Sequence, residues 1–181
     1  MMSEVNAYQA LVELATRGET ISIDLPSLDD TPTHWAGLGF NLLGQRFVSP
    51  MDEVAELMRM PQATRVPGVK DFVVGVGNVR GRLMAILDLD VYFGQASNRP
   101  RAQRRVLAYE LEDRYMGFII DESLGMQHFP SDTFEEDAGE VADMFMPFLR
   151  GSYRVAGIQW PVLSLEALAQ DPNFETLAVA A

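Results

Sequence analysis

The chain has 181 residues, with 14 lysines and arginines against 26 aspartates and glutamates, and a formal net charge of −12 at pH 7. This negative charge repels phosphate backbones and anionic lipid headgroups, so we expect neither nucleic-acid binding nor direct membrane insertion. The absence of cysteine excludes disulfides, thiolate metal sites and cysteine nucleophiles, and it fits a reducing compartment. The length suits one domain with two subdomains, which buries roughly 70% of its surface on folding.

The first 36 residues are expected to be a helix followed by a linker. Residues 19–36 mix prolines, aspartates and hydroxyl side chains, which predicts a loop before a main fold that begins near Trp35. The start has no basic segment followed by an apolar run, and no later stretch reaches about 18 apolar residues, so we expect a cytoplasmic protein. Apolar side chains recur at helical spacing ahead of a terminating Gly18, at Val5, Tyr8, Leu11, Val12 and Ala15.

Strand signals begin after Gly39. The apolar runs 40–43 and 46–48 flank Gly44-Gln45, which is typical of a hairpin turn between half-buried strands. Further runs at 54–57, 72–76 and 83–87 are short and bounded by proline or glycine, so they have the lengths of strands and not of helices.

The first unit is expected to close with a helical turn at 88–93, ended by Gly94. Asp88 and Asp90 would share one face of a strand, which could serve acid–base chemistry or a cation, but helix capping is the favoured interpretation. The segment 95–104 contains serine, asparagine, proline and three arginines, and is expected to be an internal linker.

The second half repeats the first about 68 residues downstream. Runs at 105–111 and 115–120 rebuild the hairpin around a turn at 112–114, which predicts a duplicated β unit. Many short strands with little helix indicate a mainly β fold of two small packed barrels. Four matches support the repeat: Arg46-Phe47 with Arg114-Tyr115, Asp52-Glu53 with Asp121-Glu122, Arg80-Gly81 with Arg150-Gly151, and Leu87-Asp88-Leu89 with Leu163-Ser164-Leu165 after a spacer six residues longer.

The sequence offers little for catalysis. The two histidines, His34 and His128, lack a metal-ligand partner at i+3 or i+4, and we expect ordinary loop or packing roles for both. No Gly-x-Ser-x-Gly elbow occurs, and the glycines at 75–81 lead into a strand instead of a phosphate-binding helix. We therefore expect no catalytic residue, cofactor or metal.

One motif carries a resemblance to a known family. A lead-in at 64–68 (Thr-Arg-Val-Pro-Gly) and an apolar strand precede the turn at 75–81 (Gly-Val-Gly-Asn-Val-Arg-Gly), and a second strand ends in Asp88-Leu89 before Phe93-Gly94. In this order and spacing the segment resembles CheW-like coupling domains. The extension, the entry at 35–40 and the segment 65–70 look most like the PilI-type adaptors of type IV pilus chemosensory systems, which control twitching motility.

The resemblance implies two five-stranded SH3-like barrels with a short N-terminal helical extension. The implied domains are an N-terminal helix and linker at 1–36, a CheW-like domain at 37–169, and a C-terminal tail at 170–181. The domain would divide into subdomains at roughly 37–98 and 99–169, with exchange of strands between them left open.

The resemblance also implies a function. CheW-like proteins are non-catalytic scaffolds that bridge the cytoplasmic tip of a methyl-accepting chemoreceptor to the regulatory domain of a CheA-type histidine kinase, in arrays at the membrane. It implies that partner binding involves Arg80, Val54, Glu56, Gly75, Asn78 and Val79. Structural roles stay open beside this one, since Arg80 could close its turn and Val54 could face a strand's inner side. An alternative function is a small-molecule sensor that binds a ligand in the cleft between the barrels.

Overall fold

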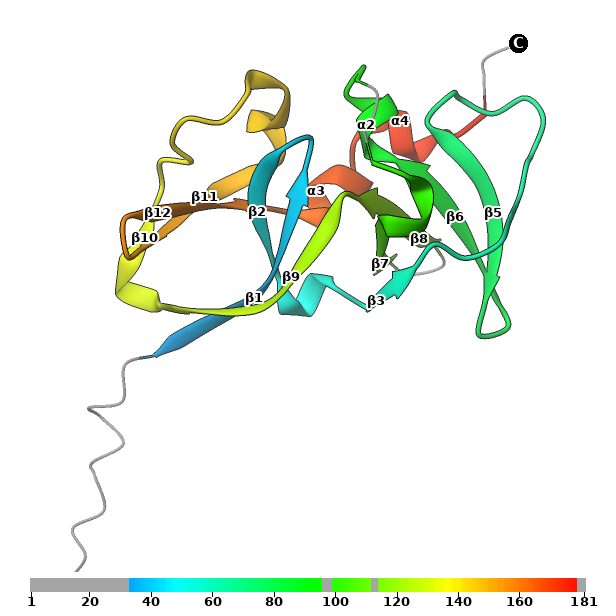
Figure 1. Cartoon of the computed structure of the whole chain (residues 1–181). Coiled ribbons are helices and arrows are strands. Elements are labelled where there is room, and N and C mark those ends of the chain that lie inside the picture. The colour runs from blue at the N-terminus through cyan, green and yellow to red at the C-terminus, as the bar shows by residue number, and fades with distance from the viewer. Residues whose placement is uncertain (1–32, 96–98, 112–113, 179–181) are drawn as a thin grey trace, which may run out of the picture. The chain divides into compact units, whose positions relative to one another are not determined.

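A computed structural model describes residues 33–95, 99–111 and 114–178, which form two six-stranded sheets with short helices between them (Figure 1). The predicted helix at 1–18 and the loop up to residue 32 lie outside this part of the chain. The mainly β prediction is confirmed. Each sheet has six strands instead of five, because the two-residue strands β4 and β10 join the sheets at one edge.

The first sheet has the order β10-β11-β12-β2-β1-β9. Its strands are β1 (His34–Leu42), β2 (Gln45–Pro50), β9 (Glu122–Pro130), β10 (Phe134–Glu135), β11 (Leu149–Val155) and β12 (Ile158–Leu163). The second sheet has the order β3-β7-β8-β6-β5-β4. Its strands are β3 (Glu56–Arg59), β4 (Ala63–Thr64), β5 (Val73–Val79), β6 (Arg82–Asp88), β7 (Arg105–Leu111) and β8 (Arg114–Ile120).

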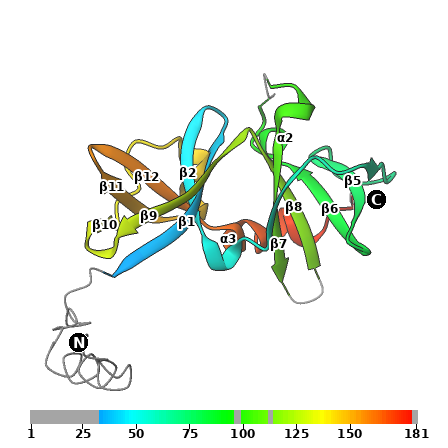
Figure 2. The same cartoon turned by 60° about the horizontal axis from the view of Figure 1, so that its bottom comes forward.

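Short helices connect these strands. The α-helices among the described residues are α2 (Leu89–Tyr92), α3 (Leu165–Ala169) and α4 (Pro172–Glu175), and the 3-10 turns are η2 (Met51–Glu53), η3 (Arg101–Gln103), η4 (Ser131–Thr133) and η5 (Asp143–Phe148). In Figures 1 and 2, α3 lies between the two sheets. None of the described helices is both long enough and apolar enough to cross a lipid bilayer.

Each sheet combines a hairpin from one half of the sequence with strands from the other half. The β1–β2 hairpin pairs with the late strands β9 and β12, whereas the β7–β8 hairpin pairs with the early strands β3 and β6. The second strand of each hairpin pairs with its new neighbour in parallel: β2 with β12, and β8 with β6. Each sheet therefore contains strands from both sides of residue 98, and the two halves of the sequence exchange strands.

The duplication is present, but two of the four sequence matches are wrong. Gln45 and Arg114 are the first residues of β2 and β8, so Arg46-Phe47 corresponds to Tyr115-Met116 and not to Arg114-Tyr115. Arg80-Gly81 forms the β5–β6 turn, whereas Arg150-Gly151 lies inside β11. The counterpart turn is Ala156-Gly157, whose φ values of 51° and 76° resemble the 53° and 83° of Arg80-Gly81. With this alignment the spacer before Leu163 has the same length as that before Leu87, and the extra six residues disappear.

The first hairpin turn falls one residue earlier than predicted. Its central residues are Leu43-Gly44, with φ values of 52° and 76°, and not Gly44-Gln45. Positive φ at both central positions is what a type I′ hairpin turn needs, and the second position is glycine in all three such turns of the described chain. β1 also begins earlier than the predicted strand, at His34.

Apolar side chains form three cores. One lies inside each sheet: Met84, Ile86 and Ile119 belong to the second sheet's core, and Phe129 and Tyr153 to the first sheet's core. A larger central core draws on both sheets and the helices, and includes the fully buried Phe40, Phe47, Leu87, Phe118 and Leu163. This central core makes residues 33–178 one packed unit.

The segment set apart as a C-terminal tail is not a free tail over its described part. Phe174 of α4 is 2% exposed and its ring lies 5.1 Å from Phe72 and 5.7 Å from Phe118. Lys70 donates from its backbone N–H to Leu177, and its ammonium donates to the carbonyl of Asn173. Residues 170–178 therefore close the central core next to β5.

Candidate partner-binding site

The predicted site centres on the turn of the β5–β6 hairpin. Arg80 stands at its first central position with φ 53°, and its side chain is 79% exposed. One guanidinium nitrogen donates to Oε1 of Glu56 on β3 at 2.8 Å. Two residues that the sequence analysis selected separately are thus brought together on the surface. An ion pair this exposed contributes at most about 1 kcal/mol to folding.

Two other predicted site residues have clear structural roles in this hairpin. Asn78 accepts a hydrogen bond at its side-chain Oδ1 from the backbone N–H of Gly81, at 2.9 Å, which closes the turn. Gly75 has φ 150°, and a Cβ there would lie 2.3 Å from the carbonyl oxygen of Thr64. The close approach of β4 to β5 therefore requires glycine at position 75.

The last two predicted residues are half-buried. Val79 packs against the core of the second sheet, and Val54 packs against the central core. Val54 lies just before β3 and not inside a strand, since β3 begins at Glu56. Its backbone N–H donates to Met51 and ends the 3-10 turn η2. These contacts place Glu56 relative to the turn, and partner binding by Val54 and Val79 stays a prediction.

Further exposed groups lie close to Arg80. Arg82 donates to Glu110 at 2.8 Å, and its guanidinium lies 4.8 Å from the centre of the Tyr115 ring. The donated hydrogen bond lowers the pKa of Glu110 below its ordinary value. Next to Arg82, Leu83 is 72% exposed. Arginine and a large apolar side chain on one hairpin end are typical of protein contact surfaces.

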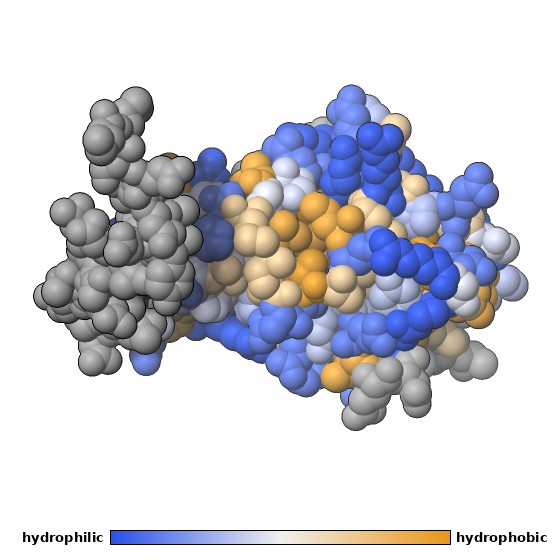
Figure 3. Space-filling model, turned by 90° about the horizontal axis from the view of Figure 1, so that it is seen from below, coloured by the Kyte–Doolittle hydropathy of each residue, from blue (hydrophilic) through white to orange (hydrophobic). Residues whose placement is uncertain are grey.

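Apolar side chains also gather on the face shown in Figure 3, with hydrophilic side chains on either side of them. This face is the lower side of Figure 1, along which β1, β9 and β3 run. Exposed apolar side chains on these strands include Leu57 of β3 and Met126 of β9. An apolar area with polar edges is typical of a surface that contacts another protein.

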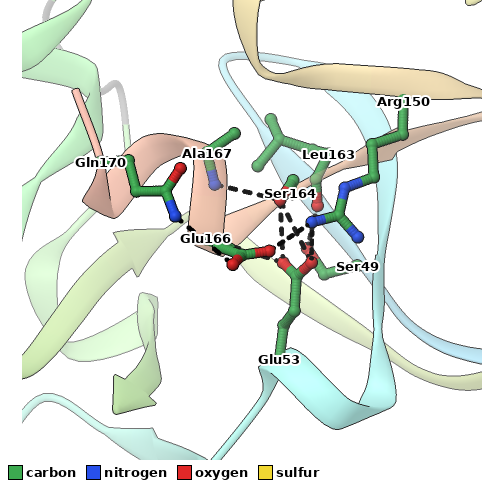
Figure 4. Close-up of polar contacts among 8 residues, drawn as sticks. All are labelled: Ser49, Glu53, Arg150, Leu163, Ser164, Glu166, Ala167 and Gln170. Carbon is green, nitrogen blue, oxygen red and sulfur yellow. Dashed lines mark hydrogen bonds and ion pairs between the residues drawn. The ribbon is translucent and has the colours of Figure 1, made fainter. Parts of the chain in front are cut away.

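A polar network lies where β12 runs into α3 (Figure 4). The Glu53 side chain is 8% exposed and accepts hydrogen bonds from the Ser164 hydroxyl at 3.1 Å and the Glu166 N–H at 3.1 Å. Arg150 approaches the same carboxylate at 2.8 Å. Ser164 is also the N-cap of α3, where it accepts from the N–H of Ala167. Glu53 therefore ties η2 to a helix more than a hundred residues later.

A second network lies where β6 runs into α2. Asp88 caps this helix by accepting from the N–H of Asp90, so capping, the favoured interpretation, is confirmed for Asp88, whereas Asp90 lies inside the helix. Arg104 is 2% exposed and reaches both aspartates, at 3.0 Å to Asp88 and 2.8 Å to Asp90. Arg104 was predicted to lie in a linker, and its burial was not predicted. The pair of aspartates at the start of a short helix was the available signal.

Neither histidine takes part in a site. His34 and His128 are exposed on β1 and β9, so they lie on strands and not in loops. Among the described residues no group of three histidines or acidic side chains is arranged to hold a metal ion. The described acidic segment at 135–137 is partly paired, since Arg154 donates to Glu135 at 3.1 Å.

Comparison with known proteins agrees with this architecture. The profile of the CheW-like domain family matches residues 36–173. The protein PilI of Pseudomonas aeruginosa is 42% identical over 179 residues, which cover 98% of this chain and 100% of that protein. The chemotaxis protein CheW of Helicobacter pylori is 29% identical over 84 residues, 46% of this chain and 51% of that protein.

Solved structures give the same fold. The crystal structure of the scaffolding protein TtCheW from Thermoanaerobacter tengcongensis superposes with a TM-score of 0.68, at 19% identity, over 81% of this chain and 100% of that one. The profile match over residues 36–173 and the 42% identity to PilI over nearly the whole chain show that the chain belongs to the CheW-like family, and the two sheets agree with it.

Proposed function

We propose that this chain is a non-catalytic adaptor that couples the cytoplasmic tip of a methyl-accepting chemoreceptor to a CheA-type histidine kinase, in a system that controls type IV pilus motility. Membership of the CheW-like family supports the coupling role. The identity of 42% to PilI over nearly the whole chain supports the pilus system. Such an adaptor works in the cytoplasm and is recruited to receptor arrays at the membrane.

The observation that carries the proposal is the position of Arg80. Its guanidinium is held by a two-residue turn and by Glu56, and most of its surface remains accessible. Because the ion pair adds little to stability, the fold does not depend on an arginine here. A planar guanidinium with a restricted backbone is well suited to bind a partner's carboxylate or carbonyl groups at little entropic cost.

Coupling needs a difference in binding free energy between the signalling states of the receptor. The packed central core supports this role, because it lets the two sheets present separate surfaces on a rigid unit. We propose Arg80 and Glu56 as direct partner contacts. Val54, Gly75, Asn78 and Val79 would then act by holding the hairpin and the start of β3 in place.

The alternative function, a sensor with a ligand in a cleft between the barrels, has less support. The region where the two sheets meet is filled by buried aromatic and aliphatic side chains of the central core, among them Phe47, Phe118 and Phe174. A ligand of ordinary size would have to displace these side chains at a large cost in free energy.

The test is capture of partners from a lysate of the native organism on immobilised protein. We expect mass spectrometry to identify a CheA-type kinase and a methyl-accepting receptor on the wild type, and several-fold less of both on Arg80→Ala. Arg65→Ala is the matched control, since Arg65 is exposed and outside the hairpin end. Recovery of neither partner on folded wild-type protein would contradict the proposal.

A further inference from the structure

A surface hollow of about 600 Å³ is lined by none of the residues of the β5–β6 hairpin turn. It is formed by β3, the segment before β7, the start of β7 and the start of β9. Its lining consists of Arg59, Arg99, Ala102, Gln103, Arg105, Glu122 and Ser123. Three arginines thus face one carboxylate, in a chain whose formal net charge is −12. The hollow is thus a local excess of positive charge on a chain that is negative as a whole.

Two of these arginines are direct neighbours across the sheet. Arg59 of β3 and Arg105 of β7 are antiparallel partners, and their side chains start on the same face. Like charges directly opposite one another destabilise a pair of strands. Arg105 donates only to main-chain carbonyls, those of Gln103 at 3.1 Å and Arg104 at 3.0 Å. Arg59 is exposed and forms no ion pair with the described residues.

The single carboxylate of the hollow is already engaged. Arg99 donates to both oxygens of Glu122, at 2.8 Å and 3.1 Å, and Asn41 donates to one of them at 2.6 Å. The hydrogen bonds from Arg99 and then Asn41 lower the pKa of Glu122, so it stays ionised and bound to Arg99. The charges of Arg59 and Arg105 are therefore left without a compensating carboxylate among the lining residues.

We propose that this hollow binds carboxylate side chains of an acidic segment of a partner protein, between Arg59 and Arg105. Charge complementarity selects the partner's sign, because a carboxylate between the two guanidiniums removes their repulsion. Leu57 lies two residues before Arg59, on the same face of β3, and is 39% exposed. An apolar contact beside the charged one favours a polypeptide over a small anion.

The inference does not rest on the adaptor role, because it concerns another surface and can be tested with a probe. Full-length protein labelled with ¹⁵N is titrated with a short polyglutamate peptide, and the arginine Nε–H and backbone signals are followed. We expect saturable shifts around Arg59 and Arg105 that weaken as salt is added. Arg59→Glu should weaken binding by about tenfold or more, since it replaces a charge-assisted contact with repulsion.

Arg65→Glu is the matched control, because it makes the same change of charge at an exposed arginine outside the hollow. Arg59→Gln should bind with intermediate affinity. Equal weakening by Arg59→Glu and Arg65→Glu would mean non-specific attraction and would overturn the proposal. So would an absence of shifts at Arg59 and Arg105, or the same shifts produced by inorganic phosphate at lower concentration than the peptide. Unchanged signals from the central core would show that Arg59→Glu is folded.

Discussion

At two junctions a strand runs into a short helix, and the N-terminus of each helix is capped by a different kind of side chain. At the β6–α2 junction the cap is Asp88, and the cation beside it, Arg104, has a side chain that is 3% exposed. At the β12–α3 junction the cap is Ser164, and the cation, Arg150, is 47% exposed. The duplicated fold keeps the cap at both junctions but places its charges at different depths.

Depth decides how much each charge matters. Arg104 is surrounded by two buried aspartates, so its loss would leave negative charge in the interior. Arg150 is partly solvated, and Glu53 keeps hydrogen bonds from Ser164 and from the Glu166 N–H without it. At the β12–α3 junction the important group is therefore the buried carboxylate of Glu53 and not Arg150.

The largest effect is expected from a variant that breaks the buried network of Arg104, Asp88 and Asp90. Arg104→Ala should lower the free energy of unfolding by about 3–5 kcal/mol, because Asp88 and Asp90 are left without their cation. Urea denaturation followed by circular dichroism measures this change. Arg104→Met combined with Asp88→Asn and Asp90→Asn should recover part of the loss, since no charge then remains buried. A loss below about 1 kcal/mol for Arg104→Ala would show that the network is well solvated.

A smaller effect is expected in the network of Glu53, Ser164 and Arg150 at the β12–α3 junction. Glu53→Gln should cost about 1–3 kcal/mol, because the amide keeps one acceptor for Ser164 or the Glu166 N–H but turns a donor toward Arg150. The matched control is Glu166→Gln, which changes a 43% exposed carboxylate bound to the same arginine. This control should cost less than about 1 kcal/mol. Equal costs for both variants would refute the role of depth.

The two junctions should also differ in their response to alkaline pH, because α2 ends in Tyr92 and α3 has no tyrosine. Burial, followed by the nearby charge of Asp171, raises the pKa of Tyr92 from 10.0 to about 12. The fold therefore favours the neutral phenol. Its contribution to stability is complete below about pH 10 and is lost as the pH rises toward 12.

Thermal unfolding at a series of pH values checks this prediction. Tyr92→Phe should show a shallower fall in stability between pH 10 and 12 than the wild type. Tyr115→Phe is the comparison variant: burial also raises the pKa of that phenol, but less than for Tyr92, so this variant should reduce the fall in stability less than Tyr92→Phe does. An unchanged pH dependence in Tyr92→Phe would contradict the assignment.

Local features were predictable because their causes are local. The glycine turns, the short apolar runs and the Asp88 cap depend on neighbours in sequence, and they located most strands and α2. Arg80 and Glu56 followed from a family motif, but their contact required the packing of β3 beside the hairpin. The β1–β2 turn lies one residue earlier than predicted because Leu43 adopts the positive φ that glycine usually takes.

Long-range features were not predictable in the same way. The buried Glu53 meets Ser164 only after the β1–β2 hairpin joins the sheet of β12. The burial of Arg104 could not be predicted from its own segment, because it depends on contacts with Asp88 and Asp90. Phe174 becomes a core residue because α4 closes over Phe72. Each contact depends on which strands pair, and periodicity along the sequence does not encode that.

The adaptor role is tested most directly by kinase activity in a reconstituted system. The measurement is the rate of autophosphorylation of the CheA-type kinase recovered by capture, with its receptor in membranes, with and without this chain. We predict that the receptor changes the rate only when the chain is present, and that Arg80→Ala reduces this coupling several-fold while the protein stays folded. A rate that responds equally to the receptor without the chain, or equally with Arg80→Ala, would contradict the account.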